Sequence, residues 1–205
     1  MKQSRTWTLA LALTAAAVGV LAARLWLAPP AATALKSGTL LPAPRQIVDF
    51  ALAAEDGKPF TNADLRGRWS LVFTGFTHCP DVCPTTLSLL KGVANRLGTQ
   101  ADEVQIVFLS VDPERDTPEA LEHYVHYFSP RFRAATGPVP ELEQLGASLG
   151  FVFAKVPGPT PESYTMDHSA ALILVNPQGQ LAGYFTPPLR ADALAADLSS
   201  LLKPT

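Results

Sequence analysis

The sequence predicts an α/β domain in which strands and helices alternate around one sheet. The strand-like run Trp69–Phe76 is followed by a helical pattern and then by the continuous apolar run Val104–Val111, which is the order of a βαβ unit with a buried parallel strand. Near the C-terminus, Ser169–Val175 and Gln180–Phe185 flank a turn and indicate a β-hairpin that a last helix follows. These two patterns predict one mixed sheet.

Four amphipathic patterns predict the helices. The first covers Pro84–Leu97, with a proline in its first turn and a glycine after its end. The second begins after Thr117, an N-cap residue that a proline follows. The third covers Glu141–Leu149, and the last carries the leucines of Leu194–Leu202.

The N-terminus has the features of a membrane anchor. Lys2 and Arg5 precede Trp7–Ala23, seventeen residues without a charge, and the apolar character continues to Ala28. Such a helix can span a hydrocarbon core of about 30 Å. We therefore expect residues 1–28 to cross the cytoplasmic (inner) membrane once, with the rest of the chain on the periplasmic side.

A cleaved signal peptide is the alternative, because Ala32-Thr33-Ala34 offers small residues for cleavage. Residues 29–45 are rich in proline and alanine and lack apolar periodicity, so we expect an extended tether there. The folded domain is then expected to cover residues 46–205. Both alternatives place this domain outside the cytoplasm.

The charge of the chain argues against nucleic-acid binding. Lysine and arginine total 16 and aspartate and glutamate 18, giving a net charge of −2. No run of basic residues interrupts this balance. A protein of this composition has no positive field to attract a phosphate backbone.

Cys79 and Cys83 are the only cysteines, and they lie four residues apart at the expected start of a helix. Residues i and i+4 share a helix face, so both sulfurs can approach one point. A helix N-terminus lowers the pKa of a thiol, so we expect thiolates to form readily. A structural disulfide, a dithiol that exchanges disulfides and a metal site all remain open.

A metal site needs a third ligand, for which four histidines are available. His123 and His126 lie away from the apolar stripe of their expected helix, so we expect them to be solvated. His78 adjoins Cys79 and is either a surface residue or a weak ligand. His168 precedes an apolar strand, where a ligand and a hydrogen-bonded edge histidine are equally compatible with the local sequence.

Three motifs together resemble the Sco (SenC/PrrC-like) family. They are GFTHCPDVCPTTL, LSVDPERDTPE and YTMDHSA, at Gly75–Leu87, Leu109–Glu119 and Tyr164–Ala170, and the similarity extends from about residue 50 to about residue 202. The resemblance implies membrane-anchored copper proteins that help to assemble the copper centre of cytochrome c oxidase. It also implies a thioredoxin-like fold with an inserted hairpin.

By this resemblance, the copper ligands are Cys79, Cys83 and His168. Two thiolates and an imidazole suit Cu(I) and can also hold Cu(II). The implied function is that of a copper metallochaperone, not an enzyme, with the copper-receiving oxidase subunit and other copper chaperones as partners. The alternative is a thiol–disulfide oxidoreductase that uses Cys79 and Cys83 to reduce the recipient's cysteines.

Two nearby features have simpler interpretations. We expect Asp112–Glu119 to be a β-to-α turn in which Arg115 pairs with neighbouring acids. Met166 is expected to pack in the core, and Asp81 and Asp167 to be charges beside the site at most.

Overall fold

Strands with almost continuous apolar sequences form the centre of an eight-stranded sheet. The computed structural model describes residues 19, 35–160 and 163–203. Strands β4 (Trp69–Gly75), β5 (Val104–Ser110) and β6 (Arg133–Thr136) are parallel, and β9 (Leu172–Val175) lies antiparallel beside β4. Every residue of β5 is buried, because both faces of the sheet are covered.

Antiparallel strands extend this centre on both sides, in the order β1-β10-β9-β4-β5-β6-β2-β3. These outer strands are β10 (Gln180–Phe185) and β1 (Gly38–Gln46) on one side and β2 (Ala51–Ala54) and β3 (Pro59–Thr61) on the other. Two short 3₁₀ helices, η1 (Asn62–Leu65) and η2 (Gly98–Glu103), precede β4 and β5.

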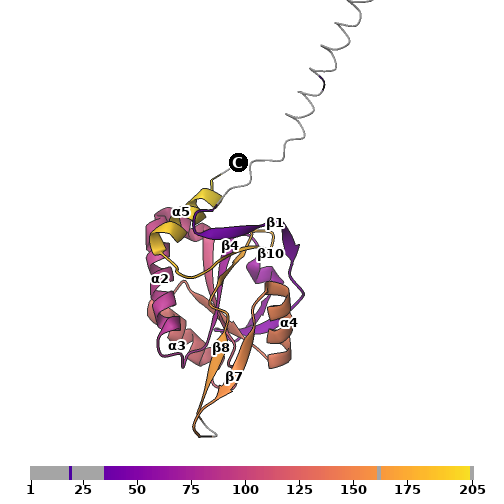
Figure 1. Ribbon diagram of the computed structural model, residues 1–205, viewed down its shortest axis with the longest axis vertical. Coiled ribbons are helices and arrows are strands. Elements are labelled where there is room, and N and C mark those ends of the chain that lie inside the picture. The colour runs from indigo at the N-terminus through magenta and orange to yellow at the C-terminus, as the bar shows by residue number, and fades with distance from the viewer. Residues whose placement is uncertain (1–18, 20–34, 161–162, 204–205) are drawn as a thin grey trace, which may run out of the picture. The chain divides into compact units, whose positions relative to one another are not determined.

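The helices cover the sheet unequally. Helices α2 (Val82–Leu97), α3 (Pro118–Phe128) and α5 (Ala191–Leu201) lie on one face, and α4 (Val139–Leu149) lies on the other (Figure 1). Successive side chains of a strand point to opposite faces of the sheet, so a separate hydrophobic core forms on each face. The fold is therefore the mixed α/β architecture that the sequence predicts.

Neighbouring residues of one strand show this division. Phe73 packs in the core beneath α2, α3 and α5, together with Phe108 of β5. Val72 and Val107 point to the opposite core, beneath α4. Phe73 and Phe108 are fully buried, and burial of such a side chain contributes roughly 1.5–3 kcal/mol.

The predicted helix signals are present where the sequence places them. The Thr117 side chain accepts a hydrogen bond from the Ala120 amide at the start of α3. Gly150 ends α4 in the left-handed conformation, with a φ of 78° that favours glycine. The prediction placed the starts of α4 and β9 within three residues of the observed ones, Val139 and Leu172.

A separate two-stranded sheet is inserted between α4 and β9. It consists of β7 (Phe153–Pro157) and β8 (Tyr164–His168), and Phe153 is paired with His168. In Figure 1 this hairpin extends from the lower end of the main sheet. An inserted hairpin is a feature that the family resemblance implies.

The segment expected to be a tether differs from the expectation. Its second half forms β1, which pairs with β10, so ordered structure begins before residue 46. Pro42 and Pro44 lie where the register shifts between Leu40 and Arg45. Prolines are tolerated at such a break in an edge strand, which explains how a proline-rich sequence joins the sheet.

The expected anchor, residues 1–28, lies outside the described residues except for residue 19. Within the described ranges, we find no helix whose length and apolar character would let it cross a membrane.

Candidate metal centre

The two cysteines lie at the start of α2. Cys83 is in the first turn, and Cys79 is in the preceding loop. The Cys79 Sγ accepts a hydrogen bond from the Cys83 amide at 3.4 Å, whereas the N-cap residue, Asp81, forms no side-chain capping bond. Both thiols are free; Cys79 is half-buried and Cys83 is fully buried. The sulfur of Cys79 thus satisfies an amide that the helix leaves unpaired.

Room for Cys83 depends on a glycine. A Cβ atom at Gly75 would lie 2.8 Å from the Cys83 Sγ and 2.6 Å from the Phe108 ring. Real Cβ atoms do not approach other atoms so closely, so the last residue of β4 must be small. The sequence contains no local signal for this requirement, because the contact joins a strand end to the following helix.

The expectation that both thiols ionise readily is wrong for Cys83. Burial raises the pKa of the Cys83 thiol well above its ordinary value, although the Phe76 backbone amide opposes the shift. Loss of hydration thus outweighs the favourable position in the first helical turn. A metal that binds Cys83 must displace this proton.

His168 ends β8 and reaches the buried thiol. Its Nε2 atom lies 3.9 Å from the Cys83 Sγ, although 85 positions separate the two residues. Its Nδ1 atom is 3.0 Å from the Ser169 carbonyl oxygen, which also accepts a hydrogen bond from the Thr74 hydroxyl at 2.9 Å. A carbonyl can only accept, so Nδ1 carries the proton and the lone pair of Nε2 faces the sulfur.

Aromatic side chains hold the imidazole from the sides. The His168 ring meets Phe73 edge-on at 6.3 Å between centroids and Phe76 at 6.1 Å. The imidazole is therefore flanked by apolar rings, which limit the access of water to it.

Asp116 orders the loop before the cysteines. Its fully buried carboxylate accepts hydrogen bonds from the Thr77 amide at 2.9 Å, the Thr77 hydroxyl at 2.6 Å and the Ser110 hydroxyl at 2.6 Å. Sequence reasoning missed this role, because 39 positions separate Asp116 from Thr77. The only available signal was a second aspartate in the turn after β5.

The turn itself matches the prediction. Thr117 caps α3, and Arg115 forms an ion pair with Asp112. His78 is exposed, and its Nδ1 atom lies 3.9 Å from a carboxylate oxygen of Asp116. The loop therefore presents His78 to solvent.

The remaining candidates lie away from the donor atoms. His123 is exposed, and His126 faces Glu122 at 4.0 Å on the surface of α3. Met166 is buried, as predicted. Asp81 and Asp167 are exposed.

Within the described ranges, no three histidine, cysteine or acidic side chains are close enough to form a complete metal site. The structure brings Cys83 and His168 into contact and places Cys79 in the loop that adjoins both Cys83 and the apolar core.

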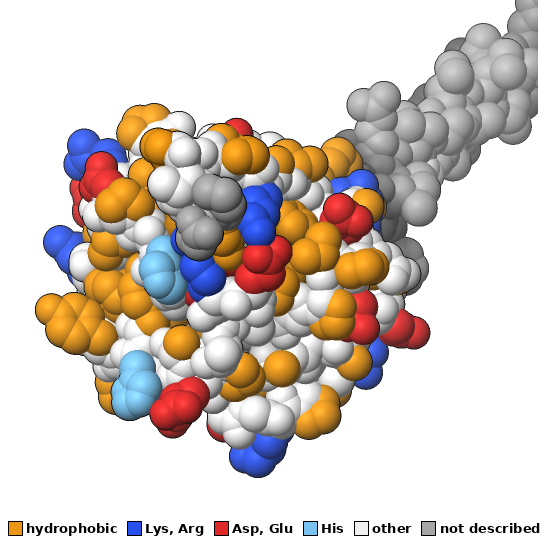
Figure 2. Space-filling model, turned by 90° about the horizontal axis from the view of Figure 1, so that it is seen from below, with side chains coloured by type: hydrophobic (Ala, Val, Ile, Leu, Met, Phe, Trp, Pro, Cys, Tyr) orange, Lys and Arg blue, Asp and Glu red, His pale blue; other side chains and the backbone are white. Residues whose placement is uncertain are grey.

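A cavity of about 290 Å³ opens beside the imidazole. Val152 and Asp167 are on its wall together with His168, and Val152 is 75% exposed. The surface seen from the hairpin side mixes hydrophobic side chains with acidic and basic ones (Figure 2). Positive charge is therefore not concentrated on that face of the described structure.

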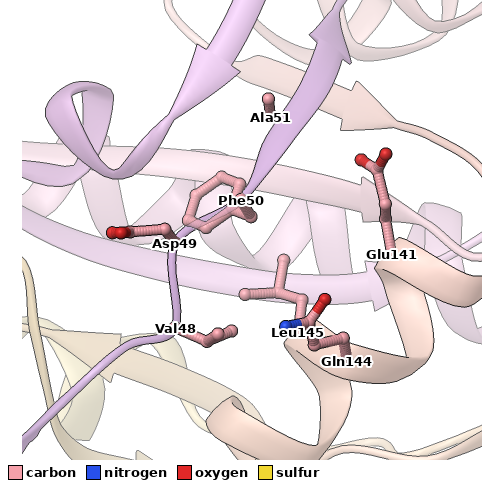
Figure 3. Close-up of a pocket in the computed structure, with 7 residues that line it drawn as sticks. All are labelled: Val48, Asp49, Phe50, Ala51, Glu141, Gln144 and Leu145. Carbon is pink, nitrogen blue, oxygen red and sulfur yellow. The ribbon is translucent and has the colours of Figure 1, made fainter.

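A second cavity, of about 380 Å³, lies between the segment 48–51 and α4 (Figure 3). The residues that line it include Asp49, Glu141 and Gln144 but no cysteine, methionine or histidine. Such residues offer only oxygen and amide groups, so a soft metal ion has better ligands at the cysteines.

The fold and the site define a class: a thioredoxin-like domain in which an imidazole approaches a buried thiol in the first turn of a helix, with a second thiol in the loop just before it. The chain belongs to the SCO1/SenC family, whose model matches residues 40–203.

Similar proteins come from bacteria and from mitochondria. A Stutzerimonas stutzeri protein whose name refers to copper binding is 39% identical over 165 residues, which cover 80% of each chain. The human mitochondrial SCO1 homolog is 34% identical over 157 residues, which are 76% of this chain and 52% of that protein. The chain thus spans only about half of the human relative.

Solved structures show the same fold. Copper-bound ScoI of Bradyrhizobium japonicum has a TM-score of 0.70 at 37% identity, over 77% of this chain and 99% of that one. Apo Sco1 of Thermus thermophilus has a TM-score of 0.74 at 35% identity, over 84% of this chain and 99% of that one.

Proposed function

We propose that this protein is a copper metallochaperone that helps to assemble the copper centre of cytochrome c oxidase. Copper is its cargo, held by Cys79, Cys83 and His168. The observation that carries the proposal is the 3.9 Å approach of the His168 Nε2 to the Cys83 Sγ, with the proton of the ring held on the other nitrogen. This arrangement presents a lone pair where a metal-bound thiolate would form.

The chemistry of the donors fits copper. Sulfur and imidazole ligands suit Cu(I), whereas a structural zinc site uses four protein ligands. Copper-bound relatives support the choice of metal. A set of three ligands leaves one side open, so the ligands of a recipient can enter before those of the donor leave.

The same residues support a second candidate, a thiol–disulfide oxidoreductase that reduces a recipient's cysteines. The two free thiols, four positions apart, favour it. Only the half-buried Cys79 is accessible for attack, since Cys83 is fully buried and its thiol pKa is raised. Exchange needs two thiols and not an imidazole, so His168 separates the two functions.

Location and partners follow from the proposed role. The copper-receiving subunit of the oxidase is the expected recipient, and other copper chaperones are expected donors. Residues 1–28 would hold the domain on the periplasmic side of the inner membrane.

The test is cytochrome c oxidase activity in cells that carry His168→Ala, at low and high copper. A metallochaperone predicts impaired assembly at low copper and partial rescue at high copper, because two sulfurs still hold Cu(I) weakly. Full activity at low copper would contradict copper delivery and favour the reductase. His126→Ala, a histidine on the surface of α3, is the control and should assemble the oxidase normally.

A further inference from the structure

Three side chains join the turn after β5 to the hairpin that carries His168. We name Asp112, Arg115 and Tyr164 the hairpin clamp. The Tyr164 hydroxyl donates to Asp112 at 2.8 Å, and the Arg115 Nε donates to the same carboxylate at 2.5 Å. The Arg115 Nη1 donates to the Tyr164 carbonyl oxygen at 3.2 Å. Each member therefore contacts both of the others.

The geometry of the clamp is that of a strong contact. The Arg115 guanidinium stacks on the Tyr164 ring, with its Cζ 3.6 Å from the ring centroid. Asp112 is 2% exposed, so water hardly competes for its oxygens. Burial, followed by the bond to Asp112, raises the pKa of Tyr164 to about 12. The hydroxyl thus remains a donor at physiological pH.

Tyr164, the clamp residue of β8, lies on the same face of the strand as His168. Side chains alternate along a strand, so Tyr164, Met166 and His168 point the same way. Met166, between them, is buried against the domain. The hairpin is not part of the main sheet, so contacts such as these decide how β8 meets the domain.

A neighbouring contact is weaker. Lys155 of β7 forms an ion pair with Glu114 at 2.6 Å, but the two side chains are 45% and 61% exposed. Exposed ion pairs contribute little, because water screens them. Among the described residues, the clamp, with its buried Asp112 carboxylate, is therefore the main polar connection between this turn and the hairpin.

We propose that the hairpin clamp positions His168 for copper: Asp112 and Arg115, by holding Tyr164, set where β8 presents the imidazole to the Cys83 thiol. The proposal rests on the proposed function. It makes Tyr164 and Arg115 positioning residues that act only through His168.

A thermodynamic cycle tests this proposal. Cu(I) affinity is measured anaerobically in the full-length chain by competition with bicinchoninate, for Tyr164→Phe, His168→Ala and the double variant. Tyr164→Phe keeps the ring and loses one hydrogen bond, so we expect its affinity to fall about three- to tenfold. In the His168→Ala background the same change should have no effect, because the imidazole to be positioned is gone.

Tyr184→Phe is the matched control, since it also loses one tyrosine hydrogen bond, to the Leu149 carbonyl oxygen. It should leave Cu(I) affinity unchanged. Arg115→Lys keeps the charge but loses the planar stacking, and it should repeat the pattern of Tyr164→Phe. Thermal unfolding of each variant shows whether it is folded.

The outcomes separate two failures. If Tyr164→Phe lowered the Cu(I) affinity equally with and without His168, or did not lower it at all, the proposal for the hairpin clamp would be wrong. The assignment of the copper ligands would not be affected. An unchanged affinity in His168→Ala alone would overturn both the ligand assignment and the clamp.

Discussion

The cysteine side of the candidate site belongs to the core, whereas the histidine side is carried by a separate hairpin. Cys83 packs among fully buried residues, and its loop is fixed by the buried Asp116. His168 ends a two-stranded sheet that reaches the domain through the clamp and the Ser169 carbonyl. Substitutions on the cysteine side should therefore lower both the free energy of unfolding and the affinity for copper. Substitutions on the histidine side should lower the affinity for copper alone.

The largest effect is expected at the thiols. Cys83→Ser should abolish stoichiometric copper binding, because a hydroxyl does not ionise to replace a thiolate. Copper content after anaerobic loading and gel filtration measures this. The control variant His126→Ala should bind copper at full stoichiometry. If Cys83→Ser were also fully loaded with copper, the Cys83 thiol could not be a copper ligand.

Gly75→Ala tests how closely the cysteine side is packed. The added methyl group would meet the Cys83 Sγ and the Phe108 ring, so we expect a loss of about 1–3 kcal/mol in the free energy of unfolding, together with weaker copper binding. Urea denaturation gives the first quantity. In Gly92→Ala, inside α2, the added methyl group would meet the flexible end of Arg96 at 3.3 Å and make an ordinary van der Waals contact with the Ala191 Cβ at 3.8 Å, so the variant should be neutral or stabilising by up to about 1 kcal/mol. Equal stability of both variants would show that the cysteine side is not tightly packed.

Asp197 lies away from both the cysteine side and the histidine side of the candidate site. It therefore provides a reference substitution whose effect on stability depends on pH. Its buried carboxylate accepts hydrogen bonds from the Lys36 amide and from the amide and hydroxyl of Ser37. Burial raises the pKa of Asp197, but these bonds together outweigh it and the net shift is downward. Asp197→Asn should therefore destabilise the domain at pH 7, by about 1.5–3 kcal/mol, without changing copper binding.

The sign of the pH effect follows from the lowered pKa. The contribution of Asp197 is complete above the unfolded-state pKa of about 3.9 and is lost as the pH falls through the folded-state value. The difference in the free energy of unfolding between wild type and Asp197→Asn, measured by urea denaturation, should thus become smaller below about pH 4. A constant difference down to pH 2 would contradict this. The exposed Asp192→Asn serves as the control and should change little.

The smallest effect is expected at the hairpin surface. Lys155→Ala removes the exposed pair with Glu114 and the contact of the Lys155 Nζ with the Tyr164 ring, 4.0 Å from its centroid, but leaves the bonds of Tyr164 to Asp112 and Arg115 in place; exposed pairs and cation–π contacts each contribute roughly 0–1 kcal/mol. Its copper affinity should be that of wild type. A loss of copper affinity as large as that of Arg115→Lys would mean that the surface contacts of Lys155, and not the hairpin clamp, position the hairpin.

The sequence predicted the central elements because their signals are local. Buried strands such as β5 are continuous apolar runs, and α3 starts at a threonine and a proline. Strands β1, β2, β3 and β6 were missed, because β2, β3 and β6 have only three or four residues and prolines interrupt the alternation in β1. The inserted hairpin of β7 and β8 was expected from the family resemblance alone.

The sequence suggested the candidate ligands, and these stay a prediction, but it did not reveal the residues that support them. Cys79, Cys83 and His168 were recognised from motifs, whereas Gly75 and Asp116 act through contacts between distant segments. The acidity of Cys83 was misjudged, because its burial depends on the packing of α2 against the sheet and is not visible in the local sequence.

The most direct test of the account is copper K-edge X-ray absorption on the Cu(I)-loaded protein and on His168→Ala. We predict two sulfur ligands and one imidazole in the wild type, and the loss of the imidazole scattering with both sulfurs retained in His168→Ala. An imidazole signal that persists in the variant, or a wild-type spectrum without sulfur, would contradict the proposed Cys79–Cys83–His168 site.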